Sequence, residues 1–320
     1  MRKPIMLLGF LLFAASCIFA GPVNPSDIDS RAVWYGHIDM ESIMNLPLVQ
    51  EIHKSSMKTQ KKNFFNQMCH KLGMQLMGEF LSATMYATQY EGEFGVVVLK
   101  FRNDLPKENL HAIFAQKYPQ RKESLIGNRS VFTWQMCFGR KHKEISGCFV
   151  NDRQILIGAD LGHVEKALEV LDQKRPSMPA HHPLMKGLTP GILFVSRAID
   201  VPAAYQFSTF CPVLRHSREA FARWTFLDGT IRGRYEFQVI DREKAELYHQ
   251  AVEGMKAMFA LRFSDFDKVL PLLNGFSIVQ AGKSVILSWE GSSDQVKTAV
   301  DQIKARRRQI REIRREFNEK

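Results

Sequence analysis

Short runs of apolar, β-branched and aromatic residues, each closed by an acidic residue and followed by a helical pattern, recur along the chain. Residues 31–39 form such a run, and it ends at Asp39, which can cap a helix that begins at Met40. Residues 191–200 repeat the layout, with Asp200 at the same junction. The pattern therefore predicts a strand that enters a helix, and it predicts this arrangement twice.

The middle and the end of these two stretches also correspond. Residues 92–101 and 230–240 each read as a strand followed by an acidic cap and a helix. Residues 148–173 read as strand, turn, strand and amphipathic helix, and residues 276–303 repeat this order with a capping box before the last helix. The correspondence indicates an internal repeat.

We therefore predict an α+β fold built from two tandem repeated units, residues 31–174 and residues 188–305. Each is expected to be a mainly antiparallel sheet covered by helices, because neighbouring strands are joined by turns and the helices have one apolar face. The segment between them, 175–187, is rich in proline and reads as a linker. Residues 306–320 follow as a basic helical tail.

The first 20 residues have the layout of a secretory signal peptide, with a basic start, a short apolar core and small residues before Gly21. Cleavage after Ala20 would give an exported protein, periplasmic or secreted. Lipid attachment at Cys17 is the alternative, since Ala15-Ser16-Cys17 resembles the end of a lipoprotein signal. No later segment offers the roughly 20 apolar residues of a transmembrane helix.

Charge changes this picture mainly at one end of the chain. The formal net charge is +11, and loss of Arg2 and Lys3 with the signal peptide would leave +9. Residues 296–320 hold nine basic against four acidic side chains, so more than half of the excess lies in the tail. Anionic partners are therefore expected to meet the protein there.

Cysteine usage is compatible with export. Four cysteines follow the predicted signal peptide, an even number for an oxidising compartment: Cys69, Cys137, Cys148 and Cys211. If residues 140–143 form a turn, Cys137 and Cys148 face each other across a hairpin and can form a disulfide. The alternative is that all four are buried free thiols.

The opening Trp34-Tyr35-x-His37-Ile38-Asp39, together with the two strand–turn–strand–helix endings, resembles a family of exported proteins from planctomycete-like and verrucomicrobial bacteria. The resemblance spans most of the chain after residue 20. It implies export and a repeated α+β build. The family has no assigned function, so the resemblance transfers no active-site residue.

Two histidine positions are candidates for chemistry. His37 and Asp39 share one face of a strand and could act as base and orienting carboxylate, but Asp39 also sits where a helix cap belongs. His181 and His182 are adjacent in the proline-rich segment and could take up a transition metal, yet no other ligand lies at suitable spacing. We therefore expect structural or solvated histidines and no catalytic, metal-binding or cofactor-binding residues.

Familiar catalytic motifs are absent from the sequence. It has no His-Glu-x-x-His, no Gly-x-Ser-x-Gly and no glycine-rich phosphate loop before a helix. Methionines gather in the first unit and could line a groove for an apolar ligand, although core packing is the usual explanation for them: Met57, Met68, Met74, Met77 and Met85. An enzyme of unknown hydrolase class and a carrier of apolar ligands remain as alternatives.

The C-terminal helix is the sharpest feature of the sequence. Apolar residues recur near heptad spacing, and arginines occupy much of the remaining surface: Arg306, Arg307, Arg308, Arg311, Arg314 and Arg315. Such a helix can lie on an anionic membrane surface, grip an anionic envelope polymer or pair with a partner helix. It can also be a solvated helix end whose positive charges favour the helix dipole. Aromatic residues do not interleave with the arginines, which argues against nucleic acid.

The sequence thus predicts an exported protein with a non-catalytic binding or structural role at the cell envelope, and the basic tail is the expected contact.

Overall fold

The computed structural model describes residues 23–51, 79–90, 95–138, 141–202 and 216–318. Contacts divide the chain into two compact units, Met1–Asp200 and Val201–Lys320. The methionine-rich stretch of the first unit lies almost wholly outside the described residues, as do Cys69 and Cys211.

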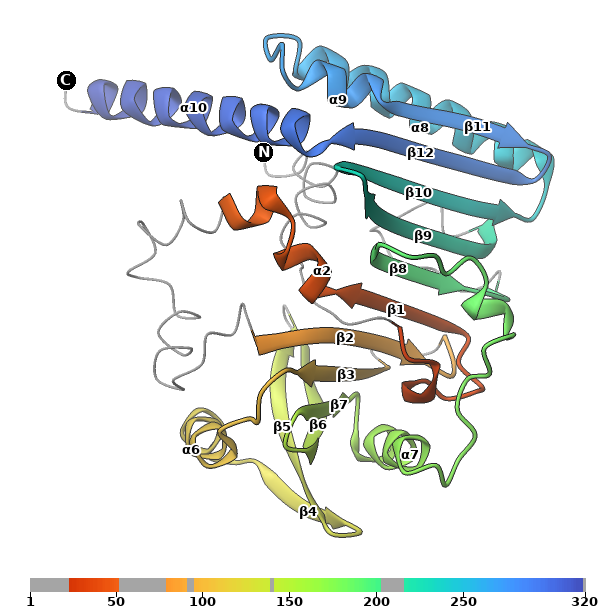
Figure 1. The fold of residues 1–320 in the computed structure, drawn as a ribbon, viewed down its shortest axis with the longest axis vertical. Coiled ribbons are helices and arrows are strands. Elements are labelled where there is room, and N and C mark those ends of the chain that lie inside the picture. Colours follow the sequence, from red (N-terminus) through yellow and green to blue (C-terminus); the bar gives the residue numbers. More distant parts are fainter. Residues whose placement is uncertain (1–22, 52–78, 91–94, 139–140, 203–215, 319–320) are drawn as a thin grey trace. The chain divides into compact units, whose positions relative to one another are not determined.

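The described part of the first unit contains an antiparallel sheet with strand order β8-β1-β2-β3-β7-β6-β5-β4 (Figure 1). The strands are β1 (Trp34–Asp39), β2 (Phe80–Ala87), β3 (Val96–Phe101), β4 (Lys122–Ile126), β5 (Arg129–Phe138), β6 (Lys141–Asn151), β7 (Gln154–Gly158) and β8 (Ile192–Ala198). The helical elements are η1 (Pro25–Asp27), α2 (Met40–Met44), α6 (Lys107–Lys117), α7 (Leu161–Leu171) and η2 (Pro183–Met185).

Helix α7 covers part of one face of this sheet. Asp160 caps the helix by accepting a hydrogen bond from the His163 backbone N–H at 2.9 Å. The buried side of α7 carries Val164 at 0% exposure and Leu168 at 2%. A Cβ at Gly158 would lie 2.9 Å from Val164 Cγ2, so glycine there lets the helix approach β7 closely.

The second unit contains an antiparallel sheet of β11 (Phe276–Ala281), β12 (Ser284–Ser292), β10 (Thr230–Val239) and β9 (Ser217–Leu227), in that order. Its helices are α8 (Arg242–Arg262), α9 (Leu270–Asn274) and α10 (Ser293–Asn318). Asp228 and Gly229 both have positive φ and join β9 to β10, as a tight two-residue hairpin loop requires.

The core of the second unit forms where α8 packs on the sheet. Ala245 of α8 and Val285 of β12 are both 0% exposed, and Val239 of β10 is 1% exposed. The Trp289 indole N–H donates to the Leu272 carbonyl at 2.8 Å, which ties α9 to β12. Burial of these apolar groups supplies the main favourable free energy of the unit.

The predicted fold class is confirmed at the level of an α+β protein with a large antiparallel sheet. The predicted strand–turn–strand–helix ends are present as β6-β7-α7 and β11-β12-α10. The capping box is present as well, because the Gln295 N–H donates to Ser292 Oγ at 3.1 Å and the Ser292 N–H donates to Gln295 Oε1 at 2.9 Å.

The segment 175–187 is packed against the first unit and is not a free linker. Ser177 forms a β-bridge with Asp29, and Leu184 is fully buried. Strand β8, expected to open the second unit, pairs along β1, so the division between units falls after Asp200. Three prolines gave this stretch the composition of a linker, but its apolar residues are long-range core contacts that composition does not reveal.

Candidate functional site

The first half of α10 is fixed to the body of the second unit. Ala299 is 2% exposed, and the helix packs on β12 and α9. The Gln302 amide oxygen accepts a hydrogen bond from the Lys268 N–H at 3.0 Å, and its amide nitrogen donates to Asp267 at 2.5 Å. These contacts end one turn before the arginine-rich stretch.

From residue 305 onward, all side chains of α10 that the structure describes are exposed: Ala305, Arg306, Arg308, Gln309, Ile310 and Glu312. Ile310 exposes 43% of its surface although it is apolar. The backbone at Arg307, Arg311, Arg314 and Arg315 is helical, but their side chains lie outside the described set. Figure 1 shows this half of α10 running past the end of β12. The predicted contact residues are therefore on a helix that projects from its unit.

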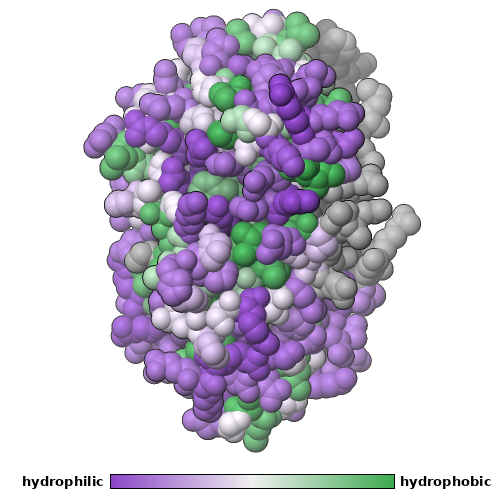
Figure 2. Space-filling model, turned by 90° about the vertical axis from the view of Figure 1, so that its right-hand side faces the viewer, coloured by the Kyte–Doolittle hydropathy of each residue, from purple (hydrophilic) through white to green (hydrophobic). Residues whose placement is uncertain are grey.

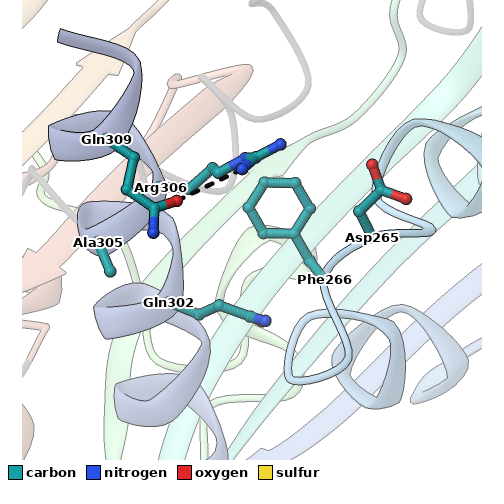
Figure 3. Close-up of a pocket in the computed structure, with 6 residues that line it drawn as sticks. All are labelled: Asp265, Phe266, Gln302, Ala305, Arg306 and Gln309. Carbon is teal, nitrogen blue, oxygen red and sulfur yellow. Dashed lines mark hydrogen bonds between the residues drawn. The ribbon is translucent and has the colours of Figure 1, made fainter. Parts of the chain in front are cut away.

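A shallow pocket of ≈ 350 Å³ lies where α10 leaves the body of the unit (Figure 3). Its lining combines a carboxylate, a guanidinium, two amides and a phenyl ring: Asp265, Phe266, Gln302, Ala305, Arg306 and Gln309. Arg306 Nη1 donates to Gln309 Oε1 at 3.4 Å, along the helix. In Figure 3 the Arg306 side chain extends from α10 toward the Phe266 ring, with Gln309 beside it on the helix.

The other predicted candidates on β1 are buried. His37 is 1% exposed, and its Nδ1 lies 2.8 Å from Thr84 Oγ1 on β2. Asp39 caps α2, accepting a hydrogen bond from the Ser42 N–H at 2.6 Å, and burial raises the pKa of its carboxyl. The surroundings of both residues therefore fit a structural role, with His37 in a buried hydrogen bond and Asp39 as a helix cap.

His37 and Asp39 belong to a buried polar patch on one face of β1 and β2. The paired positions are Tyr35 with Tyr86, His37 with Thr84, and Asp39 with Ser82, and all six residues are less than 9% exposed. Within the described residues, the hydroxyls of Tyr35 and Tyr86 have no hydrogen-bond partner. Burial raises the pKa of both phenols strongly. The alternation of strand residues places these groups on one face, but only the pairing of two distant strands joins them.

His182 has a local structural role. Its Nδ1 accepts a hydrogen bond from the Leu184 N–H at 3.2 Å and so caps η2, and burial lowers the pKa of the imidazole. His181 is exposed beside it. No group of three or more His, Cys, Asp or Glu side chains suited to a metal occurs among the described residues.

The predicted disulfide between Cys137 and Cys148 is wrong for this structure, because the two strands pair in another register. Cys137 lies opposite His142, and Cys148 lies opposite Val131. Both cysteines are free thiols, the first exposed and the second buried. The hairpin was expected to turn over residues 140–143, whereas Phe138 pairs with Lys141. Gly139, a favoured residue in two-residue hairpin loops, was the available signal for the true register.

The first unit contains a polar pocket of ≈ 460 Å³ bordered by η1, β3, the β6–β7 turn and the end of α7. Its charges are paired within the protein. Lys100 Nζ lies 2.5 Å from Asp27, and Arg129 donates two hydrogen bonds of 2.8 Å to Asp172. These pairs satisfy each other, so the lining offers no unpaired charge that would select a ligand.

Exposed apolar residues do not gather in one broad area of the face seen in Figure 2, where hydrophobic residues are scattered among hydrophilic ones. Exposed examples on α8 are Met258 at 56% and Leu261 at 77%. Scattered apolar residues of this kind are normal on a protein surface.

Comparisons with known proteins leave the family open. No known protein family matches this chain, and no curated protein does. Crystal form III of the protein TP0453 is similar with a TM-score of 0.46 and 10% identity, over 87% of this chain and 98% of that chain. Crystal form I of TP0453 gives a TM-score of 0.41 and 10% identity, over 88% and 97%. The double-ringed trimeric shell protein MSM0271 from the RMM microcompartment gives 0.13 and 17%, over 66% and 79%. Similarities of this strength assign no function to the chain.

Proposed function

We propose that this is an exported, non-catalytic protein that binds an anionic surface of the cell envelope through the exposed half of α10. One observation carries the proposal: from residue 305 onward, the described side chains of the helix are exposed and include Arg306, Arg308 and Ile310. Most helical stability in proteins comes from packing of an apolar face, whereas the described side chains from Ala305 to Glu312 are exposed and available to a partner.

The chemistry of the segment fits an anionic lipid surface. Residues 306–320 hold seven basic and three acidic side chains. A basic residue near such a surface contributes about 1 kcal/mol of attraction, and the attraction is screened beyond roughly 10 Å at moderate salt. Ile310 supplies an apolar group beside the arginines, as interfacial helices require.

The mode of attachment is peripheral in this proposal. Among the described residues, no helix combines the length and the apolar composition needed to cross a bilayer. The export part of the proposal rests on the signal-like residues 1–20, which lie outside the described residues.

The proposal also retains two tandem copies of one α+β unit. Its support is the shared order of strand, turn, strand and helix in β6-β7-α7 and β11-β12-α10. Asp160 and Ser292 each cap the last helix of their copy, which is a local likeness beyond element order.

The test is binding of the protein beginning at Gly21 to vesicles of phosphatidylcholine, with and without phosphatidylglycerol, at low and high salt. A tail variant replaces the six arginines of residues 306–315 by glutamine, which keeps helix propensity. A matched control replaces six basic residues elsewhere by glutamine: Lys122, Arg153, Lys174, Arg232, Arg242 and Arg262.

We expect the parent protein and the control to bind the anionic vesicles at low salt and to release them at high salt. The tail variant should lose at least about tenfold in affinity, because each removed contact weakens the electrostatic attraction. Equal binding by the parent and the tail variant would refute the proposal. Binding to a soluble anionic polymer but not to vesicles would indicate that the partner is an envelope polymer and not a lipid surface.

A further inference from the structure

The side chains of a cysteine and a histidine meet near the tip of the β5–β6 hairpin in the first unit. Cys137 on β5 lies opposite His142 on β6. The Cys137 Sγ is 3.2 Å from His142 Nδ1 and 3.9 Å from Nε2, and both residues are exposed. The imidazole therefore lies within hydrogen-bond reach of the thiol.

The surroundings leave the sulfur accessible. Strand β4 pairs with β5 only from Arg129 to Thr133, so it ends before it reaches Cys137. The next pair on the same face is Gln135 with Glu144, and Glu144 is engaged by Lys122 of β4 at 3.4 Å. The Lys143 side chain stands on the other face of β6, opposite Met136.

We propose that Cys137 is a reactive thiol that undergoes thiol–disulfide exchange, with His142 as the acceptor of its proton. A thiolate, rather than a thiol, is the nucleophile in this reaction, and an adjacent base is the usual means of producing it. The co-reactant is a disulfide, either of a small thiol or on the surface of a partner protein.

The exchange passes through a mixed disulfide at Cys137. The proton of Cys137 passes to His142, and the resulting thiolate attacks one sulfur of the incoming disulfide. A new S–S bond forms to Cys137 Sγ while the old S–S bond breaks. The second sulfur leaves as a thiolate and takes up the proton from His142. The incoming disulfide is the oxidant, because its leaving sulfur is reduced to a thiol as Cys137 is oxidised.

Cys148 provides an internal comparison on the same hairpin. It is 4% exposed, and burial raises the pKa of its thiol to about 11. A protonated and shielded thiol is a poor nucleophile. The two cysteines of one hairpin are thus opposite in accessibility and in their access to a base.

The experiment treats the whole folded protein with iodoacetamide at pH 7, and separately with oxidised glutathione, and measures labelling of each cysteine-containing peptide by mass spectrometry. Cys137 should react at least about a hundredfold faster than Cys148, and it alone of the two should form the mixed disulfide. His142→Gln should slow Cys137 by roughly tenfold, because the proton acceptor is lost.

The matched variant Lys143→Gln removes a positive charge from the neighbouring position without touching the sulfur, and it should leave the Cys137 rate within about twofold. Unchanged Cys137 labelling in His142→Gln, or equal slowing in both variants, would overturn the role of His142. Absence of a glutathione adduct at Cys137 would overturn the exchange itself.

Discussion

The imidazole of His37 and the hydroxyl of Thr84 meet between β1 and β2, with Nδ1 and Oγ1 2.8 Å apart and both residues 1% exposed. Their side-chain hydrogen bond links β1 to β2, and neither residue lines the two pockets described above. The same burial that removes it from solvent makes the hydrogen bond costly to break.

Thr84→Val keeps the shape of the side chain but removes the hydroxyl that forms a hydrogen bond with His37. We expect a loss of about 1–3 kcal/mol in the free energy of unfolding, because a buried polar nitrogen loses a partner. Urea denaturation followed by circular dichroism measures it. Thr298→Val on the exposed side of α10 is the control and should change stability by less than about 0.5 kcal/mol. Equal losses of stability in Thr84→Val and Thr298→Val would contradict the proposed contribution of the buried His37–Thr84 hydrogen bond.

The Arg129–Asp172 pair predicts a loss of stability in acid. Hydrogen bonds from Arg129 hold the pKa of the Asp172 carboxyl below its usual value. Its contribution is therefore present above the unfolded pKa of about 3.9 and disappears as pH falls through the folded pKa. Asp172→Asn should cost about 1 kcal/mol at pH 6 and progressively less below pH 4. Asp104→Asn, in an exposed pair with Arg153, should show little effect at either pH.

For Asp27 we predict the opposite dependence of stability on pH. Burial raises the pKa of its carboxyl despite the nearby Lys100. The folded protein then holds this proton more tightly than the unfolded chain, so the contribution of Asp27 to stability falls as pH rises above about 4. Asp27→Asn should be at least as stable as the parent at pH 7 and equal to it at pH 3. A variant that is clearly less stable at pH 7 would show that the Lys100 pair outweighs the desolvation.

Two buried tyrosines differ in whether their hydroxyl forms a hydrogen bond. Tyr90 Oη lies 3.1 Å from the Val33 carbonyl and 2.5 Å from the Ile199 carbonyl, whereas Tyr86 Oη has no partner among the described residues. Tyr90→Phe should cost about 1–2 kcal/mol, and Tyr86→Phe should be neutral or stabilising. Thermal or urea unfolding of the two variants measures the difference. A similar loss in both would place an ordered water on Tyr86.

Local features of the fold were predictable because they depend on neighbouring residues. Asp39 and Asp241 cap helices through the N–H groups of Ser42 and Lys244, three residues further on. The Ser292–Gln295 capping box is equally local, and so is the strand–turn–strand order at each end. A periodic pattern and a polar residue at a fixed short spacing encode these elements directly.

The Cys137–His142 pair could not be predicted, because it depends on a strand register that residue spacing alone does not determine. The register of β5 on β6 brings Cys137 to His142 and separates it from Cys148.

The sequence by itself determined local features: the strand–turn–strand–helix ends, the caps at Asp39 and Ser292, and the basic helix that follows Ser292. Only the tertiary structure decided that β8 pairs with β1, that segment 175–187 is packed, and that six polar residues of β1 and β2 are buried together. The physical reason is that capping is a hydrogen bond within one turn of chain, whereas register and burial follow from the packing of segments far apart in sequence.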